Sequence, residues 1–274
     1  LYHGWLALLV AVATPPALPE GERLAFAKSL AWRDRQLYSA LAGYTQLKHS
    51  AVLYAMQDMG VECDGETSYL VAVEEPILPA VRGFVEPNVP MYEGLAALAR
   101  EAYRRLYGDP EGPTADRWAD ETDPRLNAMN FARELAEIAR AEVAGRPLTE
   151  EQARFVELVG GRLEALTLGM GRSEYAFSTG GAGREERGVA LVTDIHSNTD
   201  RQQALEVGIG RIFDLWVVVP GEVGETLTQG GVLSFYEFTA PMSGRLTDAA
   251  WGERVASGTL PPRPPWTRSF IEER

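Results

Sequence analysis

The spacing of apolar residues changes once along this chain, at the glycine- and serine-rich segment Gly169–Gly188. Before this segment, apolar residues recur near every 3.6 positions, which predicts amphipathic helices. After it, β-branched and aromatic runs alternate with turn residues, which predicts strands. Because strand–helix alternations are too few for a doubly wound parallel sheet, we expect an α+β fold. Its mostly helical first two thirds should pack against a small antiparallel sheet, followed by a proline-rich extended tail.

Four longer helices are expected; Asp34–Met56 follows from its apolar spacing, and the other three also carry start and stop signals. Pro90 in the first turn and Gly108 after the last one frame a helix, and Thr149 with Gln152 has capping-box spacing. A shorter apolar run, Trp5–Ala13, predicts a core helix; it is too short to span a bilayer, which takes about 20 residues. The four longer helices are Asp34–Met56, Asn88–Tyr107, Asp123 to Gly145, and Thr149 toward Gly160.

The last third predicts an antiparallel meander closed by a short helix. Thr247 caps this helix, Thr247–Val255, and Gly258 ends it. Ser68–Val73 is also β-rich, and Pro76–Pro90 reads as an extended crossing. The expected strands are Val189–Thr193, Ile212–Val219 and Gly231–Phe238. We expect one large domain over residues 1–274, with a helical part at about 1–168, a loop at 169–188, a β-rich part at 189–258 and a tail at 259–274.

Composition excludes several functional classes. The net charge of −13 and the lack of any basic run argue against a nucleic-acid partner. Cys63 is the only cysteine, so an intrachain disulfide and a thiolate-cluster zinc site are excluded. Its acidic neighbours disfavour a thiolate nucleophile. No segment is long enough to span a membrane, and the start at Leu1 without methionine predicts a fragment of a longer protein.

The segment Val189–Asn198 holds the strongest candidate site. Asp194, His196 and Asn198 stand on alternate positions, so an extended backbone places their side chains on one face, here at a strand end. This pattern fails as an EF-hand, which needs glycine and glutamate at later positions. Calcium on Asp194 and Asn198, and less favourably zinc on His196 and Asp194, remain open beside a third role. In that role, which we place first, these groups cap the strand end and a helix starting near Asp200.

Two further residues are weak catalytic candidates beside His196. Glu237 is expected in a strand near the sheet centre, where a buried carboxylate serves either as a general acid or, more favourably, as the partner of an arginine. His49 and Tyr54 are expected on a helix that packs between other helices, with His49 hydrogen-bonded to a neighbour. The glycine pairs in 169–188 lack the sequel of a phosphate-binding loop, so no cofactor-binding site is expected.

Several stretches together resemble one family, the prokaryotic domain of unknown function numbered 3160. The chain resembles the carboxy-terminal half of its longer members. Members commonly carry an acidic residue after the helical histidine, where this chain has Ser50, which weakens a His–carboxylate pair at His49. The stretches that carry the resemblance are Trp32–Ala55, Gly83–Asn88, Ala190–Glu206, Gly230–Phe238, Arg245–Trp251 and Pro264–Phe270.

The resemblance implies an export-related setting without an assigned activity, because members are often exported and some look like lipoproteins. We therefore expect an extracellular or cell-surface protein that acts as a non-catalytic binding or structural module and is stabilised by a cation. Its expected partner is the missing amino-terminal part of the same protein or a cell-surface partner. The alternative is a hydrolase, with Asp194 and His196 binding a metal or acting as base and Glu237 as acid. Whether the chain is an enzyme stays open at this point.

Overall fold

The computed structural model describes residues 1–21, 24–56, 83–108, 124–170, 190–221 and 224–272. Within these ranges, the side chains of residues 52–56, 124–125, 164–165 and 167–170 are not described. The expectations for Cys63, Ser68–Val73 and Asp123 therefore lie outside the described residues, as do those for Pro76–Arg82 and almost all of Gly169–Gly188.

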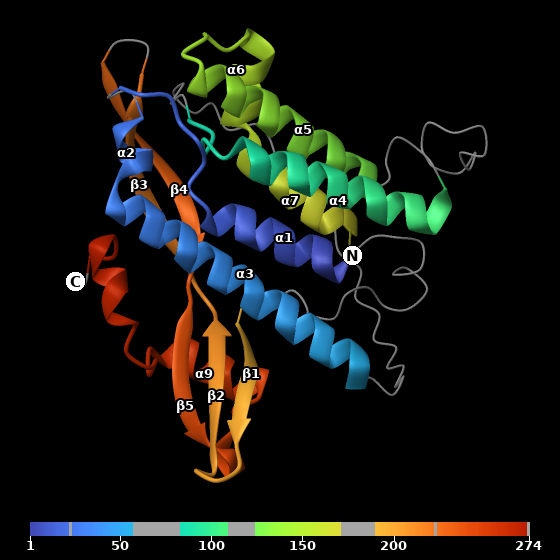
Figure 1. The fold of residues 1–274 in the computed structure, drawn as a ribbon, viewed down its shortest axis with the longest axis vertical. Coiled ribbons are helices and arrows are strands. Elements are labelled where there is room, and N and C mark those ends of the chain that lie inside the picture. Colours follow the sequence, from blue (N-terminus) through green and yellow to red (C-terminus); the bar gives the residue numbers. More distant parts are fainter. Residues whose placement is uncertain (22–23, 57–82, 109–123, 171–189, 222–223, 273–274) are drawn as a thin grey trace.

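The described residues in the first two thirds of the chain are mostly helical, as predicted. Helix α4 packs along α5, and α1 packs against both α3 and α4 (Figure 1). None of the described helices combines the length and the apolar character that a membrane crossing requires. The helices are α1 (Tyr2–Ala13), α2 (Ala25–Lys28), α3 (Leu30–Met56), α4 (Val89–Tyr107), α5 (Pro124–Val143), α6 (Glu150–Glu157) and α7 (Val159–Met170).

The predicted helix ends form through local hydrogen bonds. Asn88 Oδ1 accepts a hydrogen bond from the Met91 N–H at 3.3 Å and caps α4, and Gly108 ends this helix with a φ of 87°. Glycine suits that position because a side chain is strained at positive φ. At the start of α6, Thr149 and Gln152 exchange the two 3.2 Å bonds of a capping box. The local signals thus place these boundaries correctly.

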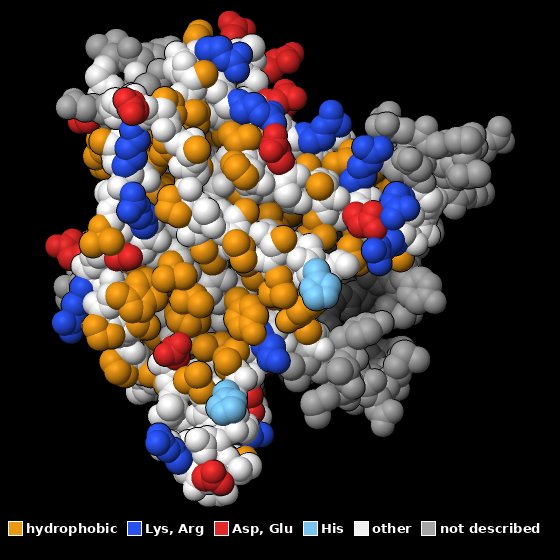
Figure 2. Space-filling view, viewed as in Figure 1, with side chains coloured by type: hydrophobic (Ala, Val, Ile, Leu, Met, Phe, Trp, Pro, Cys, Tyr) orange, Lys and Arg blue, Asp and Glu red, His pale blue; other side chains and the backbone are white. Residues whose placement is uncertain are grey.

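Helix α1 lies at the surface, although its sequence predicts a core helix. Leu8 is its only buried residue, whereas Trp5 is 42% and Val10 64% exposed. Figure 2 shows hydrophobic side chains gathered over the face on which α1 and α3 lie. The helix forms as predicted and packs on α3 and α4, but most of its described side chains stay partly or fully exposed.

The β part holds five described strands in two antiparallel sheets, where the sequence predicts a three-stranded meander. One sheet has the order β1-β2-β5, and β3 and β4 form a separate two-stranded ribbon. The predicted helix near Asp200 is wrong: residues 199–202 turn, with Gln202 at a φ of 51°, and lead into β2. The strands are β1 (Leu191–Asn198), β2 (Gln203–Ile209), β3 (Ile212–Pro220), β4 (Glu225–Leu233) and β5 (Tyr236–Pro241).

The predicted strand Gly231–Phe238 divides between β4 and β5 at Ser234. The Ser234 hydroxyl accepts hydrogen bonds from the N–H groups of Gly210 and Arg211 at 3.0 and 2.9 Å. Its own N–H donates to the Arg211 carbonyl at 2.7 Å. These bonds tie the crossing from ribbon to sheet to the β2–β3 connection, so one apolar run in the sequence serves two sheets.

The three-stranded sheet lies between α3 on one face and α9 (Asp248–Ser257) on the other (Figure 1). Tyr38 of α3 is buried with Val207 and Phe235 on the first face. Trp251 of α9 is fully buried on the second, and its Nε1–H donates to the Ile209 carbonyl at 2.6 Å. A Cβ on Gly208 would lie 2.5 Å from the Trp251 ring, so this strand position requires glycine. The α+β fold, with helices packed on a small antiparallel sheet, is confirmed.

The ends of α9 and the tail largely follow the sequence. Thr247 Oγ1 accepts the Ala250 N–H at 3.2 Å, and Gly258 ends the helix with a left-handed backbone at a φ of 75°. Two short 3₁₀ turns, η1 (Met242–Gly244) and η2 (Pro265–Ser269), flank α9 in the chain. The predicted extended tail thus contains one turn, which places Trp266 and Phe270 against Tyr38.

Candidate functional site

A β-bulge at Ile195 separates the residues that the sequence predicts to converge. Asp194 pairs with Glu206, whereas His196 pairs with Leu205, so β1 advances by two residues while β2 advances by one. Directly paired residues share a face, and successive residues of β2 point to opposite faces. Asp194 therefore lies on the α9 side of the sheet, and His196 lies on the α3 side.

The three predicted metal ligands have separate environments. The Asp194 carboxylate pairs with Arg245 Nε at 3.1 Å, and His196 is exposed. Asn198 Oδ1 accepts the Arg201 N–H at 2.9 Å, so it caps the hairpin turn where the sequence predicts it to cap a helix. Among the described residues, no three His, Cys, Asp or Glu side chains are placed to hold a metal. The geometry supports the capping role of Asn198 and gives no support to a calcium or zinc site here.

Glu237 is exposed, and the prediction that it is buried near the sheet centre is wrong. The reason is the strand order: β5 lies at the edge of the sheet, so the side chain of Glu237 borders solvent. The buried carboxylate belongs instead to Glu206, on the central strand β2, which is 1% exposed. Sequence reasoning missed Glu206, although it is the one charged residue in the run Ala204–Ile209.

Burial raises the pKa of Glu206 above its usual value, and the negative charge of Asp194 adds to this rise. The Leu246 N–H, which donates to Glu206 Oε1 at 2.9 Å, and the Arg245 charge oppose it. No described residue donates a hydrogen bond to Glu206 Oε2. The carboxyl group is therefore short of donors for a buried anion.

His49 forms a His–carboxylate pair with a residue distant in sequence. Its Nε2 lies 2.7 Å from Asp248 Oδ2, and Asp248 Oδ1 accepts the Val192 N–H at 2.9 Å. Asp248 thus links α3, the start of α9 and strand β1. The expected hydrogen bond of His49 is confirmed, while the side chain of Tyr54 lies outside the described ones. A carboxylate at position 50 is unnecessary, because Asp248 supplies one from the segment Arg245–Trp251.

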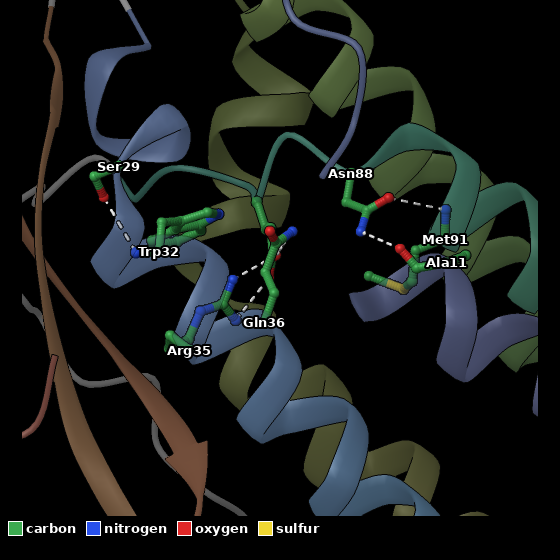
Figure 3. Close-up of polar contacts among 8 residues, drawn as sticks. Ala11, Ser29, Trp32, Arg35, Gln36, Asn88 and Met91 are labelled. Atoms are coloured by element: carbon green, nitrogen blue, oxygen red, sulfur yellow. Dashed lines mark hydrogen bonds and ion pairs between the residues drawn. The ribbon is translucent and has the colours of Figure 1, made fainter. Parts of the chain in front are cut away.

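A second polar cluster lies in the helical part, around Arg35 and Gln36 (Figure 3). Arg35 donates to both Glu86 oxygens, at 2.5 and 3.1 Å, and Gln36 Nε2 donates to one of them at 3.3 Å. The Arg35 guanidinium also lies over the Trp32 ring, 4.0 Å from its centroid. This bidentate, stacked geometry matches the charge of Glu86 within the protein.

The same cluster fixes the extended segment Gly83–Asn88 among three helices. Asn88 Nδ2 donates to the Ala11 carbonyl at 3.0 Å, at the end of α1 (Figure 3). Glu142 of α5 accepts the Val85 N–H at 3.0 Å. Burial, with the neighbouring Glu86 and Glu142 charges, raises the pKa of Tyr92 and keeps its phenol neutral. We call the contacts of Arg35, Gln36, Glu86, Asn88 and Glu142 the helical clasp; its role is to hold a loop in place.

The β3–β4 ribbon presents an apolar outer face. Its inner face, with Leu215 and Val217, packs near Trp32. The alternate residues of the ribbon point away from this core. On that outer face Val218 pairs with Leu227, and Trp216 with Gln229. Four large side chains there are about half exposed or more: Ile212 at 68%, Trp216 at 58%, Val218 at 48% and Leu227 at 56%.

Comparison with known proteins identifies the family. Residues 1–267 match the model of the family described as "Protein of unknown function (DUF3160)". No curated protein and no solved structure matches the chain. The chain belongs to this DUF3160 family.

Proposed function

We propose that this protein is an exported, non-catalytic binding module, which takes a cell-surface protein on the outer face of the β3–β4 ribbon. The observation that carries the proposal is the group of four large apolar side chains, Ile212, Trp216, Val218 and Leu227, exposed on one pair of strands. Trp216, Val218 and Leu227 are neighbours in the strand pairing, and an exposed apolar group of this kind marks interaction sites. Export is proposed from the resemblance to exported family members.

The ribbon suits an uncharged partner surface. Among the described residues of this face, Trp216, Val218, Leu227 and Gln229 are uncharged. Its acidic side chains are Asp214, to which Gln229 Nε2 donates at 3.0 Å, and Glu225 at the end of the ribbon. Since Trp216 and Val218 are fixed by strand pairing, they lose little conformational freedom when a partner covers them. An aromatic side chain within a rigid apolar patch is also the usual centre of a protein–protein interface.

The placement of the hydrolase candidates favours binding over catalysis. Asp194 lies on the α9 side of the sheet, whereas His196 and Glu237 lie on the α3 side. His196 and Glu237 are separated by the whole of strand β2, which corresponds to about 9–10 Å between their strands. Acid–base partners must converge within hydrogen-bond reach of one substrate, and these three residues do not.

A photo-cross-linking amino acid at position 216 of the full-length protein, expressed in its host, tests the proposal. We expect one discrete adduct with a second protein, which disappears in the Val218→Asp variant. The same cross-linker at Leu106, which is 63% exposed on α4, is the matched control and should give no such adduct. An adduct confined to the protein's own chain, or no adduct at position 216, would contradict a separate protein partner. Labelling of intact cells with a membrane-impermeant reagent tests export independently.

A further inference from the structure

Asp194 of β1 and Glu206 of β2 are directly paired on neighbouring strands, and both side chains lie on the α9 side of the sheet. Glu206 lies on the central strand and is 1% exposed, so water does not solvate its carboxyl group. One oxygen accepts the Leu246 N–H at 2.9 Å, and the other receives no hydrogen bond from any described residue. A buried carboxylate left in this state is costly, whereas a protonated one donates its proton to a nearby acceptor.

A single cation serves the two carboxyl groups. Arg245 Nε lies 3.1 Å from Asp194 Oδ2, and its Nη2 donates to Ser197 Oγ at 2.6 Å, so the guanidinium binds strand β1. With both acids ionised, the group Asp194, Glu206 and Arg245 carries a net charge of −1, and Glu206 is its buried member, whereas Asp194 and Arg245 are partly exposed. With one proton added, the group is neutral.

The other elements around Glu206 offer no second cation within the described residues. Strand β5 places Phe238 opposite Glu206, and Trp251 of α9 stacks on Phe238. The remaining acidic side chain at the start of α9, Asp248, is already bound to His49 and to the Val192 N–H. Among the described residues, Arg245 is therefore the one cation beside the two carboxyl groups, and it contacts Asp194.

We propose that Asp194 and Glu206 share one proton in the folded protein, with Glu206 as the donor, and that this pair is a pH-sensitive lock between β1 and β2. While the proton is present, the Glu206 hydroxyl bridges to Asp194, which Arg245 keeps ionised. When the pH rises and Glu206 loses this proton to solvent, the bridge becomes a contact between two like charges. The β1–β2 pairing beyond the bulge, from His196 to Leu205, then loosens.

Carboxyl ¹³C NMR of the full chain, selectively labelled on glutamate and aspartate, tests this inference. The Glu206 signal, assigned by through-bond correlation to its own backbone amide, should titrate above the ordinary glutamate range. It should move together with that of Asp194, because one proton serves both. In the Asp194→Asn variant we expect Glu206 to titrate about one pKa unit lower, since the like charge is gone. The Asp194→Asn variant also tests the inference if Glu206→Gln fails to fold, because Glu206 is then followed directly.

Three results would overturn the inference. Titration of Glu206 together with the exposed glutamates would show that the folded protein does not hold its proton. A Glu206 titration that calcium lowers and EDTA restores would assign the pair to a cation. Amide hydrogen exchange tests the structural part of the inference. In the wild type, the protection of residues from His196 to Leu205, corrected for the intrinsic effect of pH on exchange, should fall as Glu206 ionises. In Glu206→Gln the same protection should stay constant. Equal pH dependence in both proteins would also contradict the lock.

Discussion

The helical part and the sheet both enclose glutamate side chains, and they treat them in opposite ways. Glu86 in the helical clasp receives three hydrogen bonds from Arg35 and Gln36, so its negative charge is matched. Glu206 in the sheet receives one backbone hydrogen bond and faces a second carboxylate. The side chain of Glu86 is 22% exposed and Glu206 is 1% exposed, so the role of a carboxylate depends on its donors as well as on its burial. The number and charge of its donors separate a structural clasp from a group that responds to pH.

Substitutions in the helical clasp should lower the free energy of unfolding more than substitutions in the sheet do. We expect Arg35→Met to lower the free energy of unfolding by about 3–5 kcal/mol, because Glu86 keeps its charge without a counter-ion. The double variant Arg35→Met/Glu86→Leu should recover part of this loss. Urea unfolding measures both, and Arg105→Met, at an exposed ion pair, is the control without a measurable shift. A loss in the double variant as large as the sum of the two single ones would argue against a coupled pair.

In the sheet, apolar packing rather than charge should dominate stability. We expect Trp251→Phe to cost about 2 kcal/mol, because the smaller ring leaves a cavity and the Ile209 carbonyl loses its donor. Trp5→Phe on the exposed side of α1 is the matched control and should leave the melting temperature nearly unchanged. Similar melting temperatures for both variants would show that the contact of α9 with the sheet is weaker than its burial indicates.

The link between the two regions should contribute less. His49 joins α3 to Asp248, so we expect His49→Leu to cost about 1 kcal/mol in thermal unfolding. His196→Leu removes the exposed histidine of β1 and should have little effect. A larger stability loss for His196→Leu than for His49→Leu would contradict the view that Asp248 links the helices to the sheet.

The ribbon should contribute least to stability and most to binding. Trp216 is 58% exposed, so Trp216→Ser should change the melting temperature by no more than Leu106→Ser does. It should nevertheless remove the cross-linked partner when the cross-linker is placed at Leu227. A large drop in melting temperature would instead make the outer face a part of the folded core.

The helix ends were predictable from the sequence, because local signals determine them. Helix ends at Asn88, Gly108, Thr149 and Gly258 depend on neighbouring residues and were predictable. The site was less predictable, because one extra residue at Ile195 reverses the face of every later side chain in β1. A bulge depends on the partner strand, which one sequence does not specify.

The partners of the buried charges were also beyond local patterns. Glu86 lies 51 positions from Arg35, and Asp248 lies 199 positions from His49. The exposure of Glu237 and the burial of Glu206 follow from strand order, since β2 is central and β5 is at an edge. The stretches that carry the family resemblance nevertheless contain Arg35, Glu86, Glu206, Arg245 and Asp248. The sequence therefore pointed to the right segments, but it did not predict which of their residues pair.

The central claim is that the helical clasp needs its negative charge and the sheet pair does not. The pKa of Glu206 is raised above 4.5 in the folded protein, so the folded state holds this proton more tightly than the unfolded state does. The resulting stabilisation is complete below pH 4.5 and is lost as the pH rises through the folded-state pKa. At pH 8, urea unfolding should therefore find Glu206→Gln more stable than the wild type, a gain that shrinks toward pH 4. Glu86→Gln should be less stable than the wild type at pH 8 by about 3 kcal/mol. Opposite signs are the predicted result, and destabilisation by both substitutions at pH 8 would contradict the account.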